Sequence, residues 1–128
     1  RNNMVNTSII KTAIREAQKS NFHHRHGCVI FNGARVINSG FNEIRYCSKL
    51  NKKYRTWINS LHAEQKTILF AQAPIKRCSL LIIRINKNNK LVNSKPCKMC
   101  QSLIADVGIT KVYYSDKSGQ IQMLGLEA

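Results

Sequence analysis

Two short segments of the chain concentrate side chains that bind metals. They are His62-Ala63-Glu64 and Pro96-Cys97-Lys98-Met99-Cys100. One imidazole and two thiolates are ligands that suit zinc. Cys97 and Cys100 lie three positions apart, so on a helix both sulfur atoms lie on one side, where the positive end of the helix dipole favours thiolates. The sequence therefore predicts a zinc site formed by His62, Cys97 and Cys100.

Three protein ligands leave the fourth position of a tetrahedral zinc free for water, as in catalytic sites. Zinc lowers the pKa of this water toward about 7 and so supplies hydroxide at neutral pH. Glu64 lies two residues after His62, within reach of the water, and is expected to act as general acid and base. The alternative is a closed structural zinc site, in which the fourth ligand comes from His23, His24, His26 or Cys28.

The combination of H-x-E with P-C-x-x-C is a signature of zinc deaminases that act on nucleic-acid bases. The sequence resembles the cytidine and deoxycytidylate deaminase superfamily over most of its length. The resemblance implies that His62, Cys97 and Cys100 hold zinc and that Glu64 moves protons. The implied reaction is hydroxide attack on C4 of cytosine, or on C6 of adenine, followed by loss of ammonia. Further segments that carry the resemblance are Gly27-Cys28-Val29-Ile30, Ser39-Gly40-Phe41-Asn42 and Val112-Tyr113-Tyr114.

The resemblance also implies contacts with the substrate. Asn42 aligns with a family asparagine that contacts the sugar or the base, and Ala63 would offer its backbone to the base. Lys95 stands where relatives commonly have Glu or Ser, so contacts at that edge are not carried over. Relatives commonly assemble into dimers or larger oligomers, which implies a homo-oligomer here.

The elements that must position these residues follow from periodicity and from turn residues. The pattern predicts a helix over 4–20, a hairpin of strands 28–31 and 35–38, and a loop over 40–60. It then predicts a helix over 61–73 with Ser60 as a weak N-cap, a strand over 79–85 with a possible continuation at 91–92, a helix from Pro96 to about 107, and strands over 109–114 and 119–124. This order predicts an α/β fold, a three-layer sandwich with a mixed five-stranded sheet of the cytidine deaminase type.

The end of the chain predicts a β-hairpin. Parallel strands need a crossover of a dozen or more residues, and the segment around Lys117-Ser118-Gly119 is too short for one. The last strand is therefore expected to run antiparallel to its neighbour. Nucleic-acid-editing relatives often have a helix at this position, so the hairpin argues against placing the chain among them.

Composition limits the classes of protein. The 128 residues are 43% hydrophobic and include only 2 prolines and 6 glycines, which predicts one domain over residues 1–128. The longest aliphatic run, Leu80 to Ile83, is far shorter than a membrane span, and no signal peptide is recognised. Five cysteines without a disulfide-framework spacing predict reduced thiols in a cytoplasmic protein.

The charge predicts a polyanionic partner. The chain has 21 Lys and Arg against 6 Asp and Glu, a formal net charge of +15, and nucleic acid is the usual partner of so large a positive field. In the segment 45–57, five basic residues are interleaved with three aromatic residues, among them Tyr54 and Trp57, which could stack on unpaired bases. Arg25, within the His23-His24-Arg25-His26 cluster, is the best candidate for a phosphate contact. For both segments the alternative is a solvated loop.

These observations favour a zinc-dependent deaminase that converts cytosine to uracil in single-stranded nucleic acid. A free-nucleotide deaminase acting on deoxycytidylate or a related pyrimidine fits the motifs equally well but leaves the charge unexplained. An adenosine deaminase acting on transfer RNA has the same motifs and also needs a basic surface. The remaining alternative is a catalytically silent, zinc-containing module that binds nucleic acid.

Overall fold

The computed structural model describes residues 5–44 and 60–125. Helix α1 (Thr7–Gln18) begins after Asn6, whose Oδ1 accepts a hydrogen bond of 2.9 Å from the backbone N–H of Ser8. Such an N-cap satisfies a donor that the first helical turn leaves free. The apolar positions of α1 recur every three to four residues and are buried: Ile9, Ala13 and Ala17.

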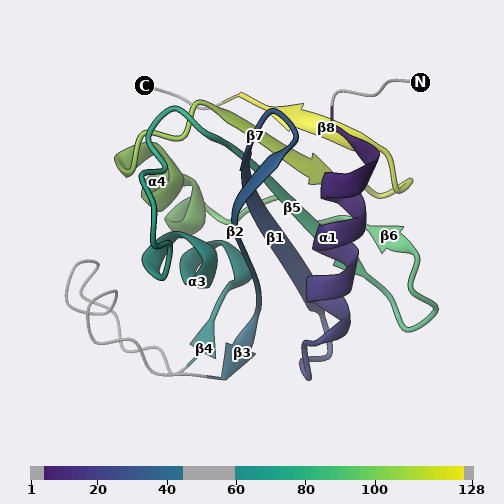
Figure 1. Ribbon diagram of the computed structural model, residues 1–128. Coiled ribbons are helices and arrows are strands. Elements are labelled where there is room, and N and C mark those ends of the chain that lie inside the picture. Colours follow the sequence, from purple (N-terminus) through teal and green to yellow (C-terminus); the bar gives the residue numbers. More distant parts are fainter. Residues whose placement is uncertain (1–4, 45–59, 126–128) are drawn as a thin grey trace.

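A mixed sheet forms the centre of the protein (Figure 1). Its strands lie in the order β2-β1-β5-β7-β8, and a short strand, β6, pairs with β5. The pairs β1–β2, β1–β5, β5–β6 and β7–β8 are antiparallel, and β5–β7 is parallel. The bounds are β1 Arg25–Asn32, β2 Arg35–Phe41, β5 Ser79–Ile85, β6 Leu91–Val92, β7 Lys111–Ser115 and β8 Ile121–Leu124. The predicted α/β class and mixed sheet are confirmed, with β6 as a sixth strand.

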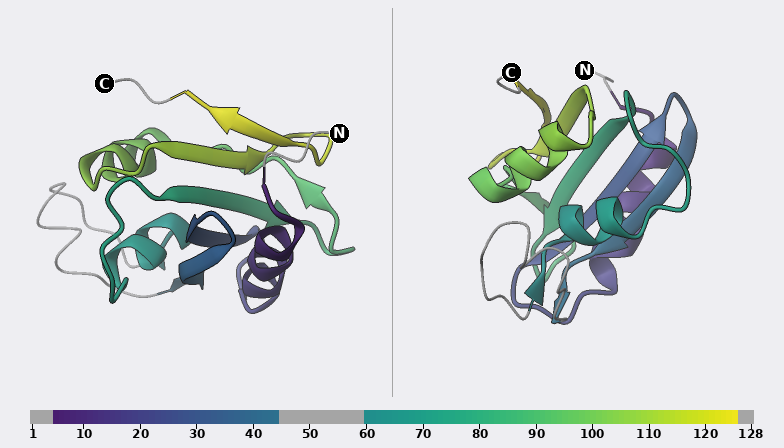
Figure 2. Two further views of the ribbon diagram at one scale, coloured as in Figure 1. Left: turned by 45° about the horizontal axis from the view of Figure 1, so that its top comes forward. Right: turned by 90° about the vertical axis from the view of Figure 1, so that its left-hand side faces the viewer.

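Helices cover both faces of this sheet, which makes three layers (Figure 2). Side chains of β5 alternate between the faces: Leu80 and Ile82 pack with helices α3 (Ala63–Leu69) and α4 (Lys98–Asp106), whereas Leu81 and Ile83 pack against α1. Helix α1 approaches β1 so closely that a Cβ on Gly27 would collide with the carbonyl oxygen of Ala13. The predicted metal ligands lie at the starts of α3 and α4, on this side of the sheet.

The predicted terminal hairpin is present. Strands β7 and β8 pair antiparallel, from Ser115 opposite Ile121 to Val112 opposite Leu124. The turn between them is closed by the carboxylate of Asp116, which accepts hydrogen bonds of 2.9 Å from two backbone N–H groups. Gly119 supplies the positive φ of +82° in this turn. A short connection therefore forces the antiparallel arrangement.

The segment before the first metal ligand differs from the prediction. Strands β3 (Glu43–Ile44) and β4 (Ser60–Leu61) form a two-stranded antiparallel sheet near the two ends of the predicted loop 40–60. Leu61, predicted as the first residue of the helix, therefore belongs to β4. The helix begins after His62, so Ser60 is not its N-cap. It ends at Leu69, well before Pro74. No helix in the described ranges is long and apolar enough to cross a membrane.

Candidate metal and base-binding site

The structure brings the three predicted metal ligands together from two helix starts. His62 is the N-cap of α3, Cys97 is the N-cap of α4, and Cys100 lies in the first turn of α4. Their donor atoms all lie within 4.8 Å of one another. His62 Nδ1 lies 3.2 Å from Cys100 Sγ and 3.8 Å from Cys97 Sγ. Nitrogen and sulfur ligands of one tetrahedral zinc are roughly 3.5 Å apart, as zinc–ligand bond lengths require, so this donor set fits zinc.

The electrostatics of these side chains also suit a cation. A hydrogen bond from Cys100, together with one from His62, lowers the pKa of Cys97 to about 3, so Cys97 is a thiolate at neutral pH. The same hydrogen bond, followed by burial, raises the pKa of Cys100. Cys100 therefore keeps its proton until a metal ion replaces that proton. The hydrogen bond to Cys97 raises the pKa of His62.

The metal group contains three ligands within residues 5–44 and 60–125. The four residues considered as a fourth ligand, His23, His24, His26 and Cys28, do not belong to it. A site with three protein ligands keeps a coordination position open, which is the arrangement of catalytic zinc sites.

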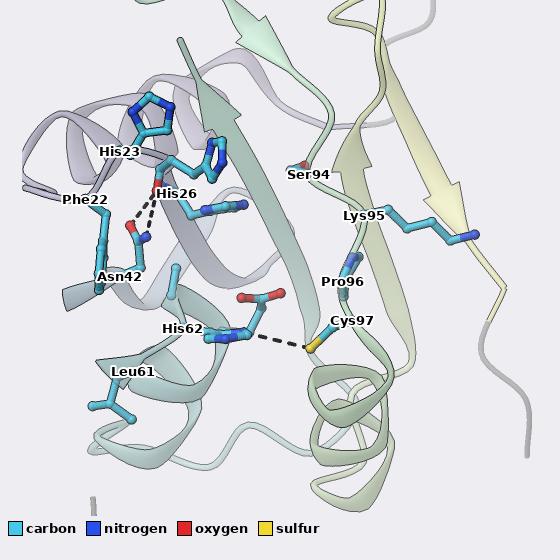
Figure 3. Close-up of a pocket in the computed structure, with 13 residues that line it drawn as sticks. Phe22, His23, His26, Asn42, Leu61, His62, Ser94, Lys95, Pro96 and Cys97 are labelled. Atoms are coloured by element: carbon cyan, nitrogen blue, oxygen red, sulfur yellow. Dashed lines mark hydrogen bonds between the residues drawn. The ribbon is translucent and has the colours of Figure 1, made fainter. Parts of the chain in front are cut away.

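A cavity of about 380 Å³ opens above the metal ligands (Figure 3). Four parts of the chain line it: the connection from α1 into β1, Asn42 after β2, the segment from Leu61 in β4 to the start of α3, and residues 94–97 before α4. Glu64 is only 4% exposed and contributes to the cavity wall. Burial raises the pKa of the Glu64 carboxyl. A buried carboxyl with a raised pKa, beside a metal site and facing a cavity, is a typical candidate for proton transfer.

Asn42 lies at the cavity and also holds the cavity wall in place. Its Oδ1 accepts a hydrogen bond of 2.9 Å from the backbone N–H of His26, and its Nδ2 donates one of 2.7 Å to the carbonyl of His24. Figure 3 shows both bonds. One amide hydrogen of Asn42 remains for a ligand. Ala63 also lines the cavity and is fully buried.

Arg25, which the sequence predicted as a phosphate contact, lies away from the cavity. The guanidinium of Arg25 donates to the carbonyl of Asn86 at 2.5 Å and to Oδ1 of Asn89 at 3.1 Å, so Arg25 holds the turn between β5 and β6. Arg25 is not among the residues that line the cavity. Tyr54 and Trp57 fall outside the described residues. Lys95 lines the cavity, and Figure 3 shows its side chain directed away from His62 and Cys97.

Sequence reasoning missed Ser94, which also lines the cavity. Its hydroxyl donates to the carbonyl of Ile82 in β5 at 2.8 Å and accepts from the backbone N–H of Ser115 in β7 at 2.9 Å. Its own backbone N–H donates to the carbonyl of Ser115 at 2.8 Å. Ser94 therefore joins β5 to β7 just beyond their last paired residues, three residues before Cys97. A small polar residue ahead of Pro96 was the only sequence signal for this role.

Comparison with known proteins agrees with this geometry. The family model for the cytidine and deoxycytidylate deaminase zinc-binding region matches residues 4–116. An uncharacterized deaminase in the luxG 3′ region of Aliivibrio fischeri is 26% identical over 96 residues, which are 72% of this chain and 58% of that protein. This chain thus spans little more than half the length of that curated relative.

Solved structures share the fold. The dCMP deaminase of the cyanophage S-TIM5 aligns with a TM-score of 0.65 at 21% identity, over 92% of this chain and 87% of that one. The cytidine deaminase of Burkholderia pseudomallei aligns with a TM-score of 0.64 at 13% identity, over 96% and 94% of the two chains. Since the family model covers most of the chain and the zinc donor set is assembled, the protein belongs to the cytidine and deoxycytidylate deaminase family and carries its zinc-binding site.

Proposed function

We propose that this protein is a zinc-dependent hydrolase that converts the cytosine of a free pyrimidine nucleotide to uracil. The observation that carries the proposal is the three-ligand donor set beside the buried Glu64, both at one cavity of about 380 Å³. Small-molecule sites begin at roughly this volume. The cavity therefore suits one nucleotide with its base at the zinc end.

Each residue of the site has a distinct part in this reaction. His62, Cys97 and Cys100 would hold zinc, which makes water nucleophilic at neutral pH when bound. Glu64 would take a proton from the attacking water and deliver protons to the ring nitrogen and to the departing amino group. Asn42 and the backbone of Ala63 would orient the sugar and the base.

Two features favour a free nucleotide. The fold of this chain resembles that of a dCMP deaminase, the S-TIM5 enzyme, for which a complex with dCMP and dUMP is known. In addition, β7 and β8 are joined as an antiparallel hairpin, where nucleic-acid-editing relatives often have a helix.

A cytosine in single-stranded nucleic acid is the second candidate, favoured by the net charge of +15. A zinc deaminase acts only on a base that has left the stack, so the same cavity would hold one flipped nucleotide of a strand. Neutralised phosphates make such binding strongly dependent on salt. Activity on a strand should therefore fall steeply between low and physiological ionic strength.

The test is uracil formation by the zinc-loaded protein, with deoxycytidylate and a cytosine-containing single-stranded oligonucleotide offered in parallel. We expect turnover of deoxycytidylate. Replacement Glu64→Ala should lower kcat by about 10²–10⁴-fold, the usual contribution of a positioned acid–base group, and should leave the bound zinc and the fold intact. Full turnover by Glu64→Ala would contradict the role of Glu64, and turnover of the oligonucleotide alone would make the second candidate correct.

A further inference from the structure

Arg84 places a positive charge on the same face of the sheet as the cavity. In the antiparallel pairing of β1 with β5, Arg84 lies directly opposite His26, which lines the cavity. Side chains of such a pair lie on one face of the sheet. Alternation along β5 agrees, because Ile82, two residues earlier, packs on the α3 and α4 side.

The guanidinium of Arg84 is incompletely satisfied. Its Nε is buried and has no hydrogen-bond partner among the described residues. The ion pairs seen in residues 5–44 and 60–125 join Lys19 to Glu16 and Lys66 to Glu43, and neither involves Arg84. A partly desolvated cation without a counter-charge is unfavourable. Arg84 does not itself line the cavity, but an anion held beside His24 and His26, which do, would relieve this.

His24 and His26 lie near Arg84, and their rings can donate hydrogen bonds. The positive charge of Arg84 lowers the pKa of His24. The pKa of His26 is lowered to about 4, mainly by burial and to a smaller extent by the charge of Arg84. Both imidazoles also line the cavity. The corner between β1 and β5 thus offers one cation and two neutral rings, which suits an anion with several oxygen atoms.

We propose that Arg84 and His24 form a phosphate subsite at the edge of the cavity and select substrates in which the pyrimidine carries a phosphate. The proposal rests on the proposed function for the position of the base. The phosphate has two possible sources, the free nucleotide or the phosphodiester of a single strand. The position of Arg84 is the same whichever source supplies the phosphate.

The test measures equilibrium binding of products, so it needs no turnover. Zinc-loaded protein is titrated with deoxyuridine, with dUMP and with a short single-stranded oligonucleotide that contains one deoxyuridine. We expect dUMP to bind roughly 10- to 100-fold more tightly than deoxyuridine, as charge-assisted bonds to phosphate do. Arg84→Gln should remove most of this difference and change the binding of deoxyuridine less than twofold.

Two controls make the result specific. Lys111→Gln removes the same charge at an exposed position at the opposite end of β5 and β7, and it should retain the preference for dUMP. Inorganic phosphate should weaken the binding of dUMP to the wild-type protein but not the binding of deoxyuridine, a measurement that requires no variant. A smaller effect of Arg84→Gln on dUMP than on the oligonucleotide would identify the phosphodiester of a strand as the source.

The proposal is overturned if the wild-type protein binds dUMP no more tightly than deoxyuridine, or if Arg84→Gln leaves the difference unchanged. Its failure is distinguishable from failure of the proposed function. If the protein deaminates deoxycytidylate but binds deoxyuridine and dUMP equally well, only the proposal of a phosphate subsite is contradicted. If the protein prefers dUMP to deoxyuridine through Arg84 but deaminates neither deoxycytidylate nor the oligonucleotide, only the proposed reaction is contradicted.

Discussion

At the scale of single residues, the metal ligands take part in both the fold and the site. His62 follows strand β4 and caps α3, and its backbone N–H donates to Oε1 of Gln65 at 2.8 Å. Cys97 is the N-cap of α4, and its side chain makes no capping hydrogen bond. The N-cap position leaves each side chain free to face the other helix. Both ligands are therefore fixed by the helix starts and not by flexible loops.

His26 gives a prediction at this scale. It lies among Arg84, His24 and His62, and its pKa is lowered to about 4, mainly by burial. The imidazole of the unfolded chain takes up a proton below about pH 6.5, whereas that of the folded chain does not until about pH 4. The stability that His26 contributes is therefore complete above pH 6.5 and is lost as the pH falls toward 4.

Replacement His26→Leu removes this titration. Between pH 7 and pH 5, the free energy of unfolding of the wild type should fall by about 2 kcal/mol more than that of the variant, since one proton corresponds to about 1.36 kcal/mol per pH unit. Urea unfolding at the two pH values measures the difference. His23→Leu, at an exposed neighbour, is the matched control and should behave as the wild type does. Parallel pH profiles of His26→Leu and the wild type would contradict the prediction.

At the scale of elements, the segment between β6 and α4 decides where Cys97 lies. The parallel pairing of β5 with β7 ends at Ile82 and Tyr114, and the next residue of β7, Ser115, bonds to Ser94 instead. The hydroxyl of Ser115 donates to the carbonyl of Val92 at 2.6 Å. Two buried serines thus tie the segment between the strand ends.

We expect Ser94→Ala to loosen this connection. The substitution leaves the carbonyl of Ile82 and the N–H of Ser115 without the hydroxyl, and a buried group without a partner costs about 1–3 kcal/mol. Urea unfolding should show a loss of roughly 2–4 kcal/mol for the two groups, and a chelator should remove zinc faster. Ser102→Ala, at an exposed position of α4, should change neither quantity. Unchanged stability and zinc retention in Ser94→Ala would show that the bridge does not position Cys97.

At the scale of the whole molecule, charge is far from balanced. Lys and Arg outnumber Asp and Glu by 21 to 6, and several of the acidic groups are already engaged. Glu16 binds Lys19, Glu43 binds Lys66, and Asp116 binds within its own turn. Mutual repulsion of the remaining positive charges destabilises the compact state, and it is reduced when salt screens them.

Added salt should therefore stabilise the protein. Raising NaCl from 50 to 500 mM is expected to gain about 1 kcal/mol, or an increase in Tm of roughly 3–5 °C for a chain of this length. Thermal unfolding of the zinc-loaded protein at several salt concentrations measures the effect. A Tm that falls with salt would mean that attractive ion pairs outweigh the repulsion among the positive charges.

Local sequence was sufficient for the zinc donor set, the class of fold and the terminal hairpin. The spacing of Cys97 and Cys100 fixes their common side because helix geometry is local. Likewise, the short segment around Gly119 forces an antiparallel turn whatever the rest of the chain does. The prediction was wrong for the start of α3, because the short pairing of β3 with β4 extends to Leu61 and overrides helical periodicity. It was also wrong for the end of α3, which lies at Leu69.

The surroundings of the cavity were decided only by tertiary structure. The pairing register of β1 with β5 places Arg84 opposite His26, 58 positions away along the printed sequence, and no local pattern specifies that register. The same register carries Arg25 to the turn between β5 and β6, away from the cavity where the sequence had suggested it. Long-range strand pairing depends on how all the faces of the sheet are buried together. The sequence alone therefore determined which atoms could bind zinc, and the fold determined which side chains a substrate would meet.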